Sequence, residues 1–206
     1  MVQTLIVKIF RIEKYIRYLL ATFMSKLICS FYFYVRGVQI GSFRSAGVPY
    51  VYKSFPARIV IGDRFTMNNG VRYSGLGING KCRIEVRDTA QLVIGNNVGM
   101  SDVTITCHEK ITIGNNVLLG VGAVIRDSDS HSLNPQDRLI GLDWKNKQTA
   151  PIVIKDNVFV GMNTIILKGV TIGENSVVGA GSVVSRDIPD NEVWAEVEMA
   201  ADVDYQ

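Results

Sequence analysis

Three features of the 206-residue sequence predict an all-β fold, a parallel β-helix built from hexapeptide repeats. Between about residues 154 and 189 a branched aliphatic residue returns every six positions, and a small or branched residue follows it four positions later. Glycine often comes directly after the aliphatic residue, where a corner leaves little room for a Cβ. A six-residue unit suits one short strand plus one turn of a β-helix. The aliphatic series is Ile154, Val160, Ile166, Ile172, Val178 and Val184, and the second series is Val158, Thr164, Val170, Ser176 and Ser182.

Residues 1–36 predict an amphipathic helix. One face is apolar at intervals of three and four residues, and the basic residues up to Arg17 fall on the other face. Because these charges interrupt the apolar residues and the uncharged run 18–25 is short, we expect no segment that crosses a bilayer. Two interpretations stay open: the helix packs against the β-helix or a partner subunit, or it lies on an anionic membrane surface. The apolar face is Leu5, Ile9, Ile12, Ile16, Leu19, Phe23 and Leu27, and the basic residues are Lys8, Arg11, Lys14 and Arg17.

Residues 37–59 carry no clear repeat, so we expect an irregular connector there and a β-helix over 60–189. The pairs Asn96–Asn97 and Asn115–Asn116 are interpreted as turns, because asparagine tolerates left-handed backbone conformations. The repeat becomes regular from residue 94, with one seven-residue unit in the middle. Its predicted inward positions are Ile94, Met100 and Thr106, followed by Ile113, Leu119 and Ile125.

The repeat stops at residues 131–150, an inserted loop without hexads. A long excursion inside a compact domain is usually functional. Its entrance is the sequence Arg-Asp-Ser-Asp-Ser-His at 126–131. This stretch is therefore the first place to search for catalytic residues.

Composition excludes several classes of function. A net charge of +3 and a pI near 8.7 do not indicate binding to nucleic acid. The three cysteines have no paired spacing, so we expect neither a disulfide framework nor a metal site, and a reducing, cytoplasmic setting fits. Residues 190–206 form a short tail that is rich in acidic residues.

The hexads of residues 154–189 resemble those of the hexapeptide-repeat acyltransferases, in particular the sugar O-acetyltransferases of surface-polysaccharide synthesis and the galactoside and maltose acetyltransferases. The resemblance implies a left-handed helix, against the usual right-handed crossover. It also implies a homotrimer with acetyl-CoA as the donor, bound in a groove between two subunits. The acceptor would be a sugar hydroxyl, in polysaccharide or O-antigen synthesis. The acidic tail departs from the basic, hydrophobic tail of that family, which puts the C-terminal end of the donor site in doubt.

The entrance of the insert resembles the catalytic loop of the same family, and by that match His131 is the general base. Imidazole can take a proton from a hydroxyl and return it to a leaving thiol near neutral pH. A carboxylate on its other nitrogen would fix the tautomer. Asp129 and Asp127 are both candidates for that carboxylate. His108, the other histidine, is interpreted as a solvated turn residue.

The resemblance assigns further site residues by position. Ser101 matches a polar residue on the rung before the catalytic loop, where a hydroxyl could bind the acceptor or the oxyanion. Five positions match the donor site of the family: Phe159, Met162, Ala180, Ser185 and Arg186, the last suited to a phosphate. No metal is expected, since the carbonic anhydrases of this fold need three histidines and the chain has two.

Two other functions stay open. The chain could be a catalytically silent scaffold of a polysaccharide-synthesis complex, or it could acetylate a xenobiotic or the nitrogen of an amino sugar. If the N-terminal helix lies on a membrane, we expect peripheral attachment to the inner leaflet, where three helices of a trimer would act together.

Overall fold

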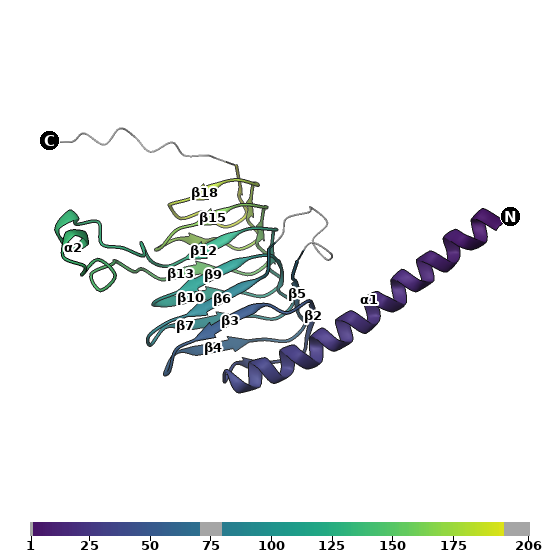
Figure 1. Ribbon diagram of the computed structural model, residues 1–206. Helices are drawn as coiled ribbons and strands as arrows, with labels where there is room; N and C mark the ends of the chain where they lie inside the picture. Colours follow the sequence, from purple (N-terminus) through teal and green to yellow (C-terminus); the bar gives the residue numbers. More distant parts are fainter. Residues whose placement is uncertain (1, 71–79, 196–206) are drawn as a thin grey trace.

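The chain forms the predicted left-handed parallel β-helix, a stack of triangular coils with three parallel sheets as its walls (Figure 1). The computed structural model describes residues 2–70 and 80–195. Each coil passes through sheets A, B and C in turn. Sheet A contains β1 (Gln39–Ile40), β4 (Arg58–Ile61), β7 (Gln91–Ile94), β10 (Lys110–Ile113), β13 (Ile152–Ile154) and β16 (Thr171–Ile172). Sheet B contains β2 (Phe43–Ala46), β5 (Phe65–Asn68), β8 (Gly99–Ser101), β11 (Leu118–Leu119), β14 (Phe159–Val160), β17 (Val177–Val178) and β19 (Val193–Trp194). Sheet C contains β3 (Tyr50–Lys53), β6 (Arg83–Val86), β9 (Thr104–Cys107), β12 (Val124–Arg126), β15 (Ile165–Ile166) and β18 (Val183–Val184).

The repeat series fill the core as predicted. Every member of the aliphatic series and of the second series between residues 154 and 184 is buried. In-register pairing stacks them into columns, so that Ile113 lies on Ile154 and Ile154 on Ile172. Burial of each such aliphatic side chain contributes about 1.5–3 kcal/mol.

An asparagine ladder turns the chain from sheet A to sheet B. Its five members have φ between 56° and 64°, a left-handed conformation that asparagine adopts more readily than most residues. Each side-chain amide donates to the carbonyl oxygen of the next asparagine at 2.9–3.0 Å. The predicted turns at 96–97 and 115–116 belong to this corner. The ladder consists of Asn97, Asn116, Asn157, Asn175 and Asn191.

The β-helix begins earlier than the sequence indicated. Residues 37–59 are not an irregular connector, because β1, β2 and β3 lie within them and β4 begins there. These strands pair in register with the next coil, as Val51 does with Ile84. The strands were missed because their buried residues do not recur every six positions.

One predicted inward position is wrong. Thr106 pairs with Arg126, whereas Ile105 pairs with Ile125 and is fully buried. The unit from Met100 is therefore one residue shorter than a hexad. Asp102, with φ of 50°, makes the tighter corner possible.

The C-terminal end also extends past the predicted limit at residue 189. β19 adds a strand to sheet B, and the Trp194 ring lies over the end of the core next to Val178 and Ile188. The Arg186 guanidinium stacks on that ring at 4.9 Å. Residues 196–206 of the predicted acidic tail lie outside the described residues.

The predicted N-terminal helix is α1 (Val2–Val35). Its last turns close the first coil, where Cys29 and Phe33 are buried and the Tyr32 hydroxyl donates to the carbonyl of Val51 at 2.9 Å. The rest of α1 projects away from the β-helix (Figure 1). Large apolar side chains are exposed along it, including Phe10, Ile16, Leu20, Phe23, Leu27 and Phe31.

By length and composition, one helix in the described part of the chain could cross a membrane, Phe10–Val35 with a mean hydropathy of 1.4. The expectation that no segment is apolar and long enough is therefore wrong. Between Arg17 and Val35 the helix has one charged residue, Lys26.

Candidate active site

The insert leaves the β-helix at the corner from sheet C to sheet A, directly after β12 (Figure 1). Its two legs pair antiparallel, with a bridge between Ser128 and Thr149 and main-chain hydrogen bonds on either side of it. The N–H of Asp129 donates to the carbonyl of Gln148 at 3.1 Å, and the N–H of Ala150 donates to the carbonyl of Asp127 at 3.0 Å. This stalk fixes where His131 emerges.

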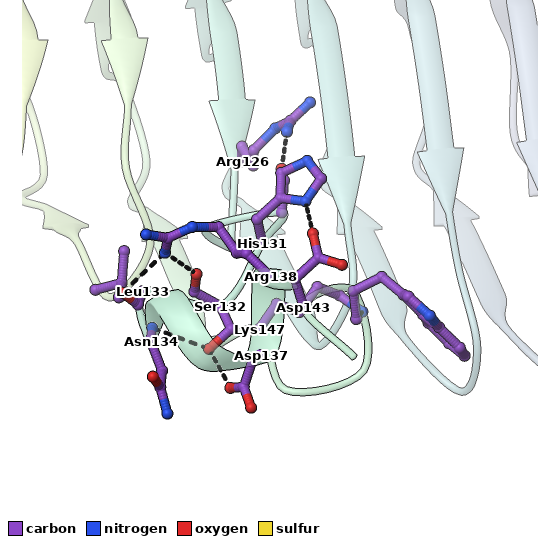
Figure 2. A network of polar contacts seen from close by, with 11 residues as sticks. Arg126, His131, Ser132, Leu133, Asn134, Asp137, Arg138, Asp143 and Lys147 are labelled. Atoms are coloured by element: carbon purple, nitrogen blue, oxygen red, sulfur yellow. Dashed lines mark hydrogen bonds and ion pairs between the residues drawn. The ribbon is translucent and has the colours of Figure 1, made fainter. Parts of the chain in front are cut away.

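The insert is ordered beyond its stalk. It contains α2 (Pro135–Leu139), whose N-cap Asn134 accepts the N–H of Gln136 at 3.0 Å. The Arg138 guanidinium donates to the carbonyls of Ser132 and Leu133 at 2.7 and 2.9 Å. The body of the insert therefore folds back on the segment that carries His131 (Figure 2).

His131 contacts a carboxylate through its Nδ1 atom. The partner is Asp143, from the same insert, and the contact is drawn as a dashed line in Figure 2. The main chain reinforces this pairing, because the N–H of Ser132 donates to the carbonyl of Asp143 at 2.9 Å. The hydrogen bond from His131 holds the pKa of the Asp143 carboxyl below its usual value.

This geometry selects one tautomer. A carboxylate can only accept, so Nδ1 carries the proton and Nε2 keeps a free lone pair. The His131 side chain is 67% exposed, so that lone pair is open to a second molecule. The pair therefore has the form of a general base with its orienting group.

The two predicted orienting groups serve other purposes. Asp127 is fully buried and accepts the backbone N–H groups of His108 and Glu109 at 2.7 and 2.8 Å. Asp129 forms an ion pair with Lys168 of the following coil at 2.8 Å. Asp127 thus stabilises a turn and Asp129 anchors the stalk, and the structure pairs His131 with neither.

His108 lies in the turn between β9 and β10, as the sequence indicated, but it is not solvated as expected. It is half-buried and lines a cleft of about 360 Å³ between the β-helix and the insert. Burial, with the nearby Lys147 ammonium, lowers the pKa of His108. The imidazole is therefore held neutral in this cleft at physiological pH.

Ser101 and His131 lie at different corners of one chain. Ser101 ends β8 and accepts a hydrogen bond from the Asn68 amide at 3.0 Å, at the corner from sheet B to sheet C. His131 follows the other end of sheet C. Strands such as β9, four residues long, separate the two corners by roughly 10–15 Å. A single chain thus does not bring these two candidates together.

The candidate residues for donor binding also lie at two different corners of the chain. Met162 and Ala180 share the corner from sheet B to sheet C, where a Cβ on Gly161 would sit 2.5 Å from the Ala180 nitrogen. Phe159, 43% exposed, projects from the outer face of sheet B before that corner. Ser185 and Arg186 follow β18 at the other end of sheet C. Met162 and Ala180 thus lie at one corner of the coils, and the Arg186 cation lies at the other.

Sequence reasoning missed Asp143 and the neighbouring Trp144. The insert contains two aspartates, Asp137 and Asp143, and its composition therefore offered both as possible partners of His131. Asp137 accepts hydrogen bonds from Ser132 and Asn146 and so belongs to the framework of the insert.

Comparison with known proteins identifies both the repeat and relatives of the chain. Residues 151–186 match the family model described as bacterial transferase hexapeptide (six repeats), and residues 110–128 match hexapeptide repeat of succinyl-transferase. An Escherichia coli K12 protein, provisionally named as the lipopolysaccharide biosynthesis O-acetyl transferase WbbJ, is 31% identical over 144 residues, 68% of each chain. Galactoside O-acetyltransferase of Lactococcus lactis is 40% identical over 92 residues, 45% of this chain and 42% of that protein.

Solved structures show similar stretches. A hexapeptide-repeat acetyltransferase from Vibrio cholerae, complexed with acetyl coenzyme A, has a TM-score of 0.47 and 34% identity over 56% of this chain and 58% of that one. A galactoside acetyltransferase in complex with coenzyme A has a TM-score of 0.45 and 27% identity over 78% of this chain and 60% of that one. Among the curated relatives, the match spans less than half the length of the galactoside acetyltransferases.

Proposed function

The chain belongs to the hexapeptide-repeat acetyltransferase family, and on that premise we propose that it transfers the acetyl group of acetyl-CoA to a sugar hydroxyl, with His131 as the general base. The pairing of His131 with Asp143 is the observation that carries this proposal. Relatives named for galactoside and lipopolysaccharide O-acetylation support the acceptor class. Surface-polysaccharide or O-antigen synthesis is the setting that we propose.

The proposed reaction is a direct transfer. Nε2 of His131 takes the proton of the acceptor hydroxyl while the oxygen attacks the thioester carbonyl. The tetrahedral intermediate collapses as the C–S bond breaks, and the imidazolium returns the proton to the leaving thiolate. Asp143 holds the ring in orientation and stabilises the imidazolium between these steps.

The donor would lie along the corner between sheets B and C. Its support is the exposure of this corner, where Ala180 is exposed and Met162 is half-buried. Phe159 offers an exposed apolar contact next to this corner. Ser185 and Arg186 stand at the other corner, where the guanidinium could bind a phosphate while it stacks on Trp194.

Because the candidate residues divide between two corners, we propose a homotrimer whose active sites lie between neighbouring subunits. A second copy would bring the Ser101 corner of one chain to the His131 corner of another. Two columns of outward apolar side chains offer a contact surface for the neighbouring subunits. One column, on sheet B, includes Phe159, and the other, on sheet C, includes Ile165. Sedimentation should give three times the chain mass of 22.8 kDa, and a monomer at micromolar concentration would overturn the assembly.

We further propose that α1 attaches the trimer to the inner leaflet as a peripheral anchor. Its support is the exposed apolar surface of the helix together with four exposed basic residues, each contributing about 1 kcal/mol near an anionic surface. Flotation with anionic and neutral liposomes should show salt-sensitive binding of the full chain to the anionic ones, lost in a chain that lacks residues 1–24. Absence of flotation at low salt would contradict the anchor. The basic residues are Lys8, Arg11, Lys14 and Arg17.

Release of free thiol from acetyl-CoA in the presence of a panel of sugars tests the proposed activity. We expect release that depends on the sugar and that disappears in His131→Ala. A folded trimer that releases no thiol with any acceptor would contradict the activity and favour the scaffold role. Release only with amino sugars would move the acceptor from a hydroxyl to a nitrogen.

A further inference from the structure

The cleft that contains His108 adjoins the catalytic pair. One wall is the outer face of sheet C, where Glu85, Thr106 and Arg126 form one column across three strands. The opposite wall is the insert, which contributes Ser130 and Trp144, the sequence neighbours of His131 and Asp143. A molecule in this cleft would therefore lie beside the general base.

Two cations in the cleft bind only neutral partners among the described residues. The Arg126 guanidinium donates to the Ser130 hydroxyl, and the Lys147 ammonium donates to the carbonyl of Trp144 at 3.0 Å. Two carboxylates also line the cleft: Glu85 forms ion pairs with Arg83 and with Arg87, a third cation of the cleft, and Asp88 is exposed at its edge. Arg126 and Lys147 come from opposite walls, so a ligand between them can meet both charges.

The cleft also holds groups suited to a sugar ring. The Trp144 side chain is 63% exposed and presents an aromatic surface at the cleft. The half-buried His108 ring also lines the cleft. Burial lowers the pKa of His108, so this ring can exchange a hydrogen bond with a hydroxyl instead of adding charge.

On the premise of the proposed activity, we propose that this cleft binds an acceptor saccharide that carries an anionic group. The anion, a carboxylate or a phosphate, lies between Arg126 and Lys147. The sugar ring packs against Trp144, and one of its hydroxyls bonds to His108. Charge-assisted hydrogen bonds of this type are about twice as strong as neutral ones, so the anion would dominate recognition.

Acetyl transfer to three probes tests the anion: methyl glucuronide, glucose 1-phosphate and methyl glucoside. We expect kcat/KM to be about 10- to 100-fold higher for one or both charged probes than for the neutral one. Which charged probe is preferred identifies the anion as carboxylate or phosphate. Equal values for all three probes would overturn the proposal.

A matched pair of variants locates the effect. Lys147→Gln should raise KM for the preferred charged probe about tenfold, with KM for methyl glucoside and acetyl-CoA unchanged. Lys145→Gln is the control, because Lys145 is an exposed cation of the same insert that does not line the cleft. A rise in KM for acetyl-CoA alone would assign the cleft to the donor and overturn the proposal.

Calorimetry separates this proposal from the proposed activity. His131→Ala should still bind the charged probe more tightly than methyl glucoside, because the binding residues are intact. If no thiol is released with any sugar but this preference is present, the activity is wrong and the anionic-saccharide site stands. Equal affinity for the charged and neutral probes would remove the site whatever the enzyme assay shows.

Discussion

Nδ1 of His131 and the carboxylate of Asp143 are in contact, although the two residues lie twelve positions apart along the chain. The main-chain bond from Ser132 to Asp143 keeps the two segments together at 2.9 Å. The base is thus oriented from within the insert and not by the β-helix below it. A change in the fold of the insert would therefore alter the chemistry without altering the coils.

Asp143→Asn should lower kcat because the amide no longer enforces the tautomer that leaves Nε2 free to accept a proton. We expect a loss of about 10- to 100-fold with little change in KM, smaller than the loss seen when a fully buried triad carboxylate is replaced. Steady-state kinetics with saturating acetyl-CoA measure it.

Asp129→Asn is the matched control for this variant. It removes the ion pair with Lys168 but leaves the contact between His131 and Asp143 in place. We expect a small loss of thermal stability and a kcat near that of the parent chain. A larger loss of kcat in Asp129→Asn than in Asp143→Asn would reverse the assignment of the orienting group.

His131→Ala should lower kcat by roughly 10²- to 10⁴-fold, the usual contribution of general-base catalysis. Its thermal stability should change little, because the side chain is exposed on a loop. His108→Ala should leave kcat nearly unchanged at saturating acceptor, since His108 binds in the cleft and does not transfer the proton. Equal losses of kcat in both variants would refute this division of roles.

The stability of the protein should fall in mild acid because of His108. Burial lowers the pKa of this histidine below the unfolded value of about 6.5, with Lys147 and Arg87 acting in the same direction and Asp127 and Asp88 opposing. Between the two pKa values the unfolded chain binds more protons than the folded chain. The free energy of unfolding therefore has its full value above about pH 6.5. It decreases as the pH falls toward the pKa of His108 in the folded chain.

Melting temperatures at several pH values from 5 to 8 measure this effect. Below pH 6.5 the melting temperature of the parent chain should fall further than that of His108→Gln, in which the side chain at position 108 does not titrate. Parallel curves for the two proteins would show that His108 is not the source of the acid sensitivity.

Local periodicity explains why the fold could be predicted. Each hexad repeats the same choice of inward residue, so columns such as Ile113, Ile154 and Ile172 can be identified without knowledge of distant contacts. The first coils escaped prediction because their buried residues are unevenly spaced. Thr106 was misplaced for a related reason, since the left-handed turn at Asp102 shortens one unit by a residue.

The site could be predicted only in part. The interruption of the repeat located His131, because an insert without hexads stands out from its surroundings. Its partner could not be found that way, because the path from His131 to Asp143 depends on α2 and on the hydrogen bonds of Arg138. Asp129 and Asp127 are nearer in sequence, but the stalk and the turn at His108 hold both carboxylates.

The asparagine ladder should make a measurable contribution to stability, and Asn157 is its central member. Asn157→Ala removes one hydrogen bond to Asn175 and one from Asn116, and it places alanine at a φ of 62°. The left-handed backbone alone costs alanine roughly 1–2 kcal/mol. With the lost hydrogen bonds we expect a melting temperature about 3–8 °C lower.

Asn157→Gly separates the two contributions. Glycine loses the same hydrogen bonds but adopts this φ without strain, so its melting temperature should lie between those of the parent chain and Asn157→Ala. The structural change should stay local, because each coil contacts only its neighbours. The contact between His131 and Asp143 lies at another corner and should therefore be unaffected. If glycine and alanine lower the melting temperature equally, the backbone conformation contributes nothing and the side-chain ladder accounts for the whole effect.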